Sequence, residues 1–223
     1  MKTIYLVRHG KAVSMDTEIS DFDRMLIEQG KNDVLNVTRR FEKRKVNASL
    51  IISSPAKRAL ETAYIVAEQL NYNKSTIKRP KVLYEQTEDA LLQVLQAIDD
   101  EHKNVIIVGH NPSLEDFSRL YIKNFNKNLP TSGVVGIVFK TNTWKEINRS
   151  KGKLKLFDFP REDKKSTTSK TMRENLEKKI TEQIENVLTK MDVDSAAKII
   201  KPIKKSSRKI AKAFLKKLKP VNK

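Results

Sequence analysis

The first 160 residues are predicted to form an α/β domain in which a mainly parallel sheet is flanked by helices on both faces. Two observations predict this fold class. Short runs of Ile, Val and Leu alternate with longer segments that repeat apolar residues every three or four positions. The short runs are nearly continuous in apolar residues, which is typical of strands that are buried on both faces.

Five short runs are predicted strands. Four of them are rich in Ile, Val and Leu and span residues 3–7, 49–53, 104–108 and 134–139. The fifth, residues 154–157, follows an irregular segment that begins at Trp144. Pro160 then ends the domain.

Four segments between these strands are predicted helices, because their apolar residues recur at helical spacing. Ser54-Pro55 precedes one of them and Asn111-Pro112 another, so that a capping residue would be followed by proline at the first helical position. The apolar residues that define the four helices are Val34, Val37 and Phe41; Ala59, Ala63, Val66, Ala67 and Leu70; Leu91, Leu92, Leu95 and Ile98; and Leu114, Phe117 and Tyr121.

Charge divides the chain into parts. The net charge is +18 over 223 residues. Residues 1–160 hold 26 Lys and Arg against 19 Asp and Glu, whereas residues 161–223 hold 19 against 8. From Ser195 to the end there are 11 basic residues and no acidic one. We therefore predict a domain over residues 1–160, a polar linker over residues 161–170, and a lysine-rich extension over residues 171–223 that is helical or partly disordered.

The composition excludes several classes of protein. The chain has no cysteine, which removes disulfides, zinc–thiolate sites and cysteine nucleophiles. No apolar run approaches the roughly 18 residues that a transmembrane helix needs. Arg8 and His9 interrupt the short apolar run at the N-terminus, which argues against a signal peptide, and a cytoplasmic location is expected. Carboxylates and histidines do not cluster with the spacing of metal ligands, so neither a metal nor another cofactor is expected.

Three strand ends carry the candidate functional residues. Arg8 and His9 follow the first strand, His110 follows the third, and Arg58 lies in the first turn of the helix after the second. The carboxyl edge of an open α/β sheet is where ligands bind. A single histidine at such a place is more often structural, but three strand ends that bring two arginines and two histidines to one edge predict a site.

This set of side chains suits phosphoryl transfer. Two guanidinium groups can each hold phosphate oxygens through paired hydrogen bonds, and helix N-termini favour an anion. A neutral imidazole is a nucleophile near pH 7, and a phosphohistidine intermediate splits one displacement into two easier steps. A second histidine can donate to the charge that develops on the phosphoryl oxygens.

Three motifs that contain these residues resemble the signature of the histidine phosphatase superfamily, whose members have a phosphoglycerate mutase-like fold. The motifs are Arg8-His9-Gly10, Ser54-Pro55-x-x-Arg58-Ala59-x-x-Thr62 and Gly109-His110-Asn111-Pro112. Further short segments narrow the resemblance to the SixA-like phosphohistidine phosphatases, namely Asp21-x-Asp23-Arg24-x-Leu26 with Gly30, and Thr131-Ser132-Gly133. The resemblance covers residues 1–160. It implies that His9 is the nucleophile and that Arg8, Arg58 and His110 hold the phosphoryl group.

The group that would protonate the leaving atom is not defined by these motifs. Many members of the superfamily use a carboxylic acid from an insertion that this chain lacks. Glu85 lies at the corresponding strand-to-helix turn and is the candidate, with a solvated loop carboxylate as the alternative interpretation. A phosphoramidate needs the acid less, because its imidazole can itself be protonated, which favours a phosphohistidine over a sugar phosphate. The third histidine, His102, is predicted to be a solvated surface residue in the acidic end of a helix.

Two other functions stay open from the sequence. One is hydrolysis of a small phosphate monoester, and the other is a non-catalytic module that holds a phosphorylated partner and is tethered by its basic tail. The 11 positive charges of residues 195–223 would repel one another unless a polyanion screens them. Apolar residues among the lysines fit a membrane-surface helix, and the lysines equally fit contacts with nucleic-acid phosphates. Contact with nucleic acid or an anionic membrane surface is therefore expected, with an unengaged, disordered tail as the alternative.

Overall fold

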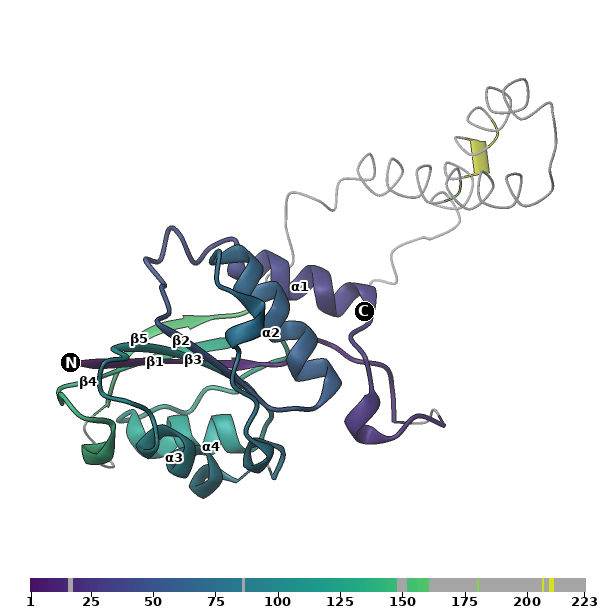
Figure 1. Ribbon diagram of the computed structural model, residues 1–223. Helices are drawn as coiled ribbons and strands as arrows, with labels where there is room; N and C mark the ends of the chain where they lie inside the picture. The colour runs from purple at the N-terminus through teal and green to yellow at the C-terminus, as the bar shows by residue number, and fades with distance from the viewer. Residues whose placement is uncertain are drawn as a thin grey trace. The chain divides into compact units, whose positions relative to one another are not determined.

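The computed structural model of the chain divides into two compact units, Met1–Pro160 and Arg161–Lys223 (Figure 1). The structure describes residues 1–15, 18–85, 87–147 and 152–160 of the first unit, and residues 180, 206, 209 and 210 of the second. The predicted linker, nearly all of the predicted extension and the expected polyanion contact therefore lie outside the described residues. Within the described part of the chain, no helix is long and apolar enough to cross a membrane.

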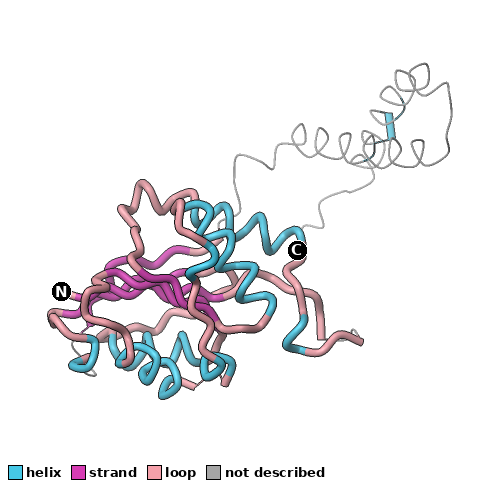
Figure 2. The backbone as a smooth tube through the Cα atoms, viewed as in Figure 1, coloured by secondary structure: helices cyan, strands magenta, loops and turns pink. Residues whose placement is uncertain are grey.

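A five-stranded mixed sheet forms the centre of the first unit (Figure 2). The strands stand in the order β2-β3-β1-β4-β5. Their bounds are Lys2–Arg8 for β1, Leu50–Ser53 for β2, Asn104–Gly109 for β3, Val134–Phe139 for β4 and Gly152–Asp158 for β5. All five predicted strands are present, and β1 occupies the middle of the sheet as its continuous apolar run suggests.

The prediction of a mainly parallel sheet is wrong for half of the strand pairings. β1 and β3 are parallel, as are β2 and β3, but β4 is antiparallel to both β1 and β5. The reason lies in the path of the chain before β4. Ser132 N donates to His9 O and Arg8 N donates to Gly133 O, each at 3.0 Å, so the chain enters β4 beside the carboxyl end of β1 and can only run back along it.

Helices cover both faces of the sheet, as predicted (Figure 1). Their bounds are Glu28–Thr38 for α1, Lys57–Gln69 for α2, Glu88–Gln96 for α3 and Ser113–Tyr121 for α4. Two apolar clusters result, one with α1 and α2 and the other with α3 and α4. Successive side chains of β3 show the alternation, because Ile106 belongs to the first cluster and Ile107 to the second.

Two helices begin later than the sequence predicts. α2 begins at Lys57 and α4 at Ser113, and neither has a side-chain cap. The hydroxyl of Ser54 accepts from the N–H of Ala56 at 3.4 Å, before α2 begins, and lies 2.8 Å from Nε2 of His110. The helix that was expected to contain His102 also ends earlier, with α3 stopping at Gln96.

The interpretation of His102 as a solvated surface residue needs correction. Its ring is only 20% exposed, and its backbone carbonyl accepts hydrogen bonds from Nζ of Lys2 and Nε1 of Trp144. Both of these side chains are buried. His102 therefore belongs to the packing at the amino end of the sheet, on the opposite side from the carboxyl ends of β1 and β3.

Candidate active site

The predicted strand ends meet at one cavity of about 350 Å3 at the carboxyl ends of β1 and β3. Its lining consists of Arg8, His9, Lys11, Ala12, Met15, Asp21, Arg24, Arg58, His110, Asn111 and Thr131. All four side chains that the motifs single out are among them. The lining holds four arginine and lysine side chains against one carboxylate, so its electrostatics favour an anion.

His9 is held in one tautomer by the backbone next to it. Its Nδ1 lies 2.8 Å from the carbonyl oxygen of Gly10. A carbonyl oxygen only accepts, so Nδ1 carries the hydrogen and the neutral ring keeps its lone pair on Nε2. The backbone N–H of Gly10 in turn donates to Oγ1 of Thr62 at 3.0 Å, and that hydroxyl donates to the carbonyl of Arg58 at 2.8 Å. These bonds tie the turn that carries His9 to the first turns of α2.

The charge state of His9 follows from its surroundings. Burial lowers the pKa of His9 to about 4, and the guanidinium groups of Arg58 and Arg8 act in the same direction against the bond to Gly10. The ring is therefore neutral near pH 7. A neutral ring with a lone pair on Nε2 is the form that can attack phosphorus.

His110 stands beside His9, with ring centroids 5.0 Å apart. The ring is buried, and its Nε2 is paired with Oγ of Ser54 at 2.8 Å. Its Nδ1 has no hydrogen-bond partner among the described residues. Burial lowers the pKa of His110 to about 3, helped by His9 and Arg58. Nδ1 is thus the ring atom that is left for a bound group.

Arg58 is anchored by a residue that the sequence did not single out as part of the site. The guanidinium is 3% exposed and donates to the backbone carbonyl of Asp21 and, at 3.0 Å, to its Oδ2. Arg24 donates to Oδ1 of the same carboxylate at 2.6 Å, and the hydroxyl of Tyr84 donates to Oδ2 at 2.9 Å. Burial acts to raise the pKa of Asp21, but the bonds from Arg24, Tyr84 and Arg58 outweigh it and lower that pKa to about 2. Asp21 is therefore ionised at neutral pH.

Arg8 is anchored by the segment that leads into β4. One of its terminal nitrogens donates to the carbonyl of Leu129 at 2.8 Å, while its buried Nε has no partner among the described residues. Glu115 accepts from the N–H of Leu129 at 2.7 Å and from the amide of Asn111 at 2.6 Å, which holds that segment in place. Burial lowers the pKa of Arg8 and Glu115 opposes this, but a guanidinium keeps its charge in proteins.

The sequence family agrees with this geometry. The model of the histidine phosphatase superfamily (branch 1) matches residues 4–86, which include Arg8, His9 and Arg58. Over these residues the chain matches the histidine phosphatase superfamily, in keeping with a phosphatase, a hydrolase.

Solved structures show the same fold. A protein assigned as the phosphohistidine phosphatase SixA from Agrobacterium tumefaciens is 24% identical, covers 72% of this chain and 99% of its own, and has a TM-score of 0.60. The protein histidine phosphatase SixA in complex with tungstate is 20% identical, with coverages of 71% and 97% and a TM-score of 0.59. A mycobacterial glucosyl-3-phosphoglycerate phosphatase in complex with VO3 is 14% identical, with coverages of 71% and 100% and a TM-score of 0.53. No curated protein sequence matches the chain significantly.

The structure places the fifth candidate of this phosphatase differently from the other four. Glu85 is exposed, directly after the short helix η3 (Lys81–Tyr84), and is not among the residues that line the cavity. Its neighbour Tyr84 does not line the cavity either, but its hydroxyl donates to Asp21, which does. The role of Glu85 as a general acid stays a prediction.

Several residues of the phosphatase pocket were missed from the sequence. Asp21 and Arg24 lie in a family motif that assigns them no role, and no sequence pattern points to Lys11 or to Tyr84, whose hydroxyl bonds to Asp21. The three-residue spacing of Asp21 and Arg24 was an available signal, because it allows an ion pair between them. Among the described residues, no group of three or more His, Cys, Asp or Glu could hold a metal ion.

Proposed function

We propose that this phosphatase removes the phosphoryl group from a phosphorylated histidine of a protein, through a covalent intermediate on His9. The observation that carries the proposal is the protonation pattern of the pocket. His9 offers a lone pair on Nε2, and the one carboxylate among the described lining residues, Asp21, is ionised. The pocket so described supplies a nucleophile and cations, but no carboxylic acid.

In the first step, Nε2 of His9 attacks phosphorus as the P–N bond of the substrate breaks. Arg8 and Arg58 hold the phosphoryl oxygens through the guanidinium N–H groups that Leu129 and Asp21 leave free. When the Ser54 hydroxyl donates to Nε2 of His110, the neutral ring carries its hydrogen on Nδ1 and can donate it to a phosphoryl oxygen. The substrate imidazole, protonated on its other ring nitrogen, leaves as a neutral molecule.

The second step uses the bond between His9 and Gly10. After phosphorylation on Nε2, the ring still carries its hydrogen on Nδ1, where the Gly10 carbonyl accepts it at 2.8 Å. Water then attacks phosphorus, the Nε2–P bond breaks, and His9 departs as a neutral imidazole. Both protons of the water stay with the phosphate product, and the starting state of His9 is restored.

This protonation pattern favours a phosphohistidine over an alkyl phosphate ester. An alkoxide leaving group needs a proton in the transition state. Asp21, with a pKa of about 2, has none to give near pH 7. In the phosphohistidine reaction, the substrate imidazole leaves in the first step and His9 in the second, and both leave as neutral rings without such a donor. The similarity in fold to proteins named SixA is in keeping with this substrate class.

The test is a comparison of substrates with the full chain. Phosphate release is measured from a histidine-phosphorylated protein domain, from p-nitrophenyl phosphate and from a sugar phosphate. We expect the highest kcat/KM for the phosphorylated domain, because its leaving group needs no acid. A higher kcat/KM for the sugar phosphate would overturn the choice of substrate.

A second measurement tests the intermediate. With a phosphorus-32-labelled substrate, rapid quenching should trap an acid-labile label on the wild-type enzyme. His9→Ala should carry no label and show no turnover, while its circular dichroism spectrum matches that of the wild type. Turnover within tenfold of wild type in His9→Ala would remove this residue from the role of nucleophile.

A further inference from the structure

Exposed apolar side chains gather on one loop beside the active site. Within the described part of residues 1–160, seven large apolar side chains are exposed, and four of these lie between residues 15 and 25. Their exposed fractions are 72% for Met15, 41% for Ile19, 40% for Phe22 and 41% for Met25. A concentration of this kind on a water-facing loop indicates an interaction surface.

The base of this loop is closed by the backbone. Ala12 and Leu26 form an isolated antiparallel bridge, and Val13 N donates to Met25 O at 2.9 Å. We call the described residues of this loop, 13–15 and 18–25, the rim loop. Arg24 strengthens the closure, because one of its terminal nitrogens donates to Val13 O at 2.8 Å.

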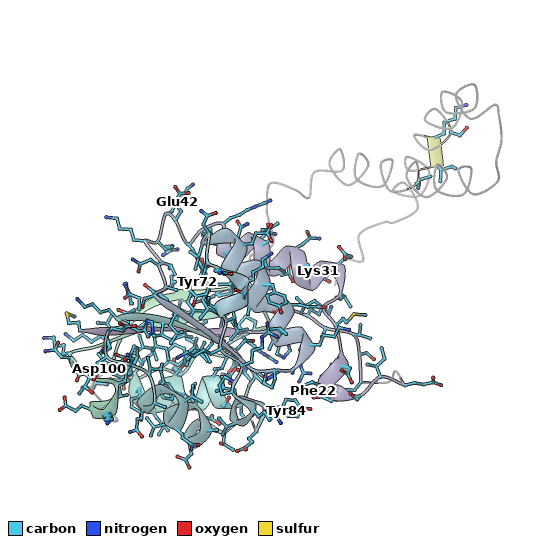
Figure 3. All side chains as sticks on the ribbon, viewed as in Figure 1. Phe22, Lys31, Glu42, Tyr72, Tyr84 and Asp100 are labelled. Atoms are coloured by element: carbon cyan, nitrogen blue, oxygen red, sulfur yellow. The ribbon has the colours of Figure 1, made fainter. Side chains whose placement is uncertain are left out.

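The rim loop has an inner side and an outer side. On the inner side, Asp21 and Arg24 line the cavity, and Asp21 holds Arg58. On the outer side, Phe22 follows Asp21 in the short helix η1 (Asp21–Asp23) and lies edge-on to the ring of Tyr84, with centroids 5.3 Å apart (Figure 3). The turn that anchors the phosphate-binding arginine therefore also presents an aromatic ring to the surface.

A small phosphate compound would not use this outer side. Ile19, Phe22 and Met25 are not among the residues that line the cavity. A ligand that fits into about 350 Å3 has no need of them, whereas a protein that inserts one phosphorylated side chain would cover the surface around the opening.

We infer that the rim loop is a docking surface for a folded protein that carries the phosphorylated histidine, an inference that rests on the proposed function. The charges around the cavity also indicate the chemistry of the partner's surface. The four cations of the cavity complement the phosphoryl group, but the exposed charges of the rim loop, Glu18 and Asp23, are acidic. The partner presents apolar side chains beside its phosphohistidine, with basic side chains at their border.

The experiment uses the full chain and leaves the cavity lining unchanged. Ile19→Ser/Met25→Ser removes two apolar side chains of the rim loop. Leu154→Ser is the matched control, since Leu154 is also 41% exposed but lies on β5. Each protein is assayed with a histidine-phosphorylated phosphotransfer domain and with inorganic phosphoramidate, which has the same P–N bond and no protein surface.

For the phosphorylated domain, we expect the double variant to raise KM at least tenfold with little change in kcat, because a few well-packed side chains carry most of the binding energy of an interface. Its kcat/KM for phosphoramidate should stay within twofold of wild type. Leu154→Ser should match wild type with both substrates. Glu18→Lys should raise KM for the domain several-fold by reversing the charge that faces the basic border.

The possible failures are distinguishable. If the wild type turns over the domain and the double variant does so with an unchanged KM, the docking surface is refuted while the proposed function stands. If phosphoramidate turnover falls as much as turnover of the domain, the loop acts through the geometry of the cavity, and the docking surface is again refuted. If the wild type releases no phosphate from the domain, the proposed function fails and the docking surface with it.

Discussion

The two histidines of the pocket should make the protein sensitive to mild acid. Their pKa values in the folded state, about 4 for His9 and about 3 for His110, lie below the ordinary value of 6.5, mainly because the protein shields both rings from water. As the pH is lowered below about 6.5, the unfolded chain therefore binds protons that the folded chain does not bind. Stability rises with pH wherever the unfolded state binds more protons, so it falls as the pH is lowered through this window.

The size of the effect at pH 5 depends little on the folded-state pKa values, as long as both stay below 5. Between pH 7 and pH 5, proton binding to one histidine with a pKa of about 6.5 stabilises the unfolded state by about 1.9 kcal/mol. The folded state gains less than about 0.1 kcal/mol from each ring over the same range. His9 and His110 together should thus lower the free energy of unfolding by about 3–4 kcal/mol, a large part of the roughly 5–15 kcal/mol that is typical of a domain.

The assay is urea unfolding at pH 7 and pH 5, in buffers without phosphate or sulfate, for the wild type and for His9→Gln/His110→Gln. His102 and all carboxylates are present in both proteins, so their contributions cancel in the comparison. The wild type should lose about 3–4 kcal/mol more than the double variant on acidification. An equal loss in the two proteins would refute depressed pKa values for the pocket histidines and, with them, the explanation of why His9 is a free base.

Three further predictions concern the pocket and the tail. Arg58→Lys should lower kcat/KM on the order of 10- to 100-fold in steady-state assays, because a point charge cannot replace two parallel hydrogen bonds to phosphate; an unchanged value would argue against that contact. Thr62→Val should reduce the free energy of unfolding by about 1–3 kcal/mol in urea titrations, since the buried N–H of Gly10 would lose its acceptor; no loss would mean that the bond is dispensable. Deletion of the residues after Asp194 should leave turnover of p-nitrophenyl phosphate within twofold, but should abolish salt-sensitive binding to duplex DNA or anionic vesicles; if the full-length protein binds neither at low salt, the proposed polyanion contact is wrong.

The carboxyl ends of the central strands were predictable, because the apolar run that marks a strand lies within its own residues. The apolar runs of β1 and β3 are recognisable from their own residues, and Arg8, His9 and His110 follow them directly in the chain. Once two parallel neighbours are assumed, their carboxyl ends must meet. The gathering of Arg8, His9 and His110 at one edge was thus predictable without knowledge of the loops.

The direction of β4 and β5 was not predictable in the same way. A strand that is buried on both faces has the same apolar composition whether it runs parallel or antiparallel to its neighbour. Its direction depends on where the preceding loop returns, and here Ser132 and Gly133 bond to the backbone of His9 and Arg8. That return also delivers the Leu129 carbonyl that anchors the guanidinium of Arg8.

Local patterns are enough to predict the strands and helices and to bring Arg8, His9 and His110 to the sheet edge, because periodicity and strand ends are properties of neighbouring residues. How these groups are held and charged depends on the tertiary fold. Asp21 meets Arg58 across 37 positions and Tyr84 across 63, while Ser54 meets His110 across 56. These hydrogen bonds arise where segments that are far apart in the chain pack together. The same packing shields the histidines from water and lowers their pKa values. No local sequence pattern specifies such contacts.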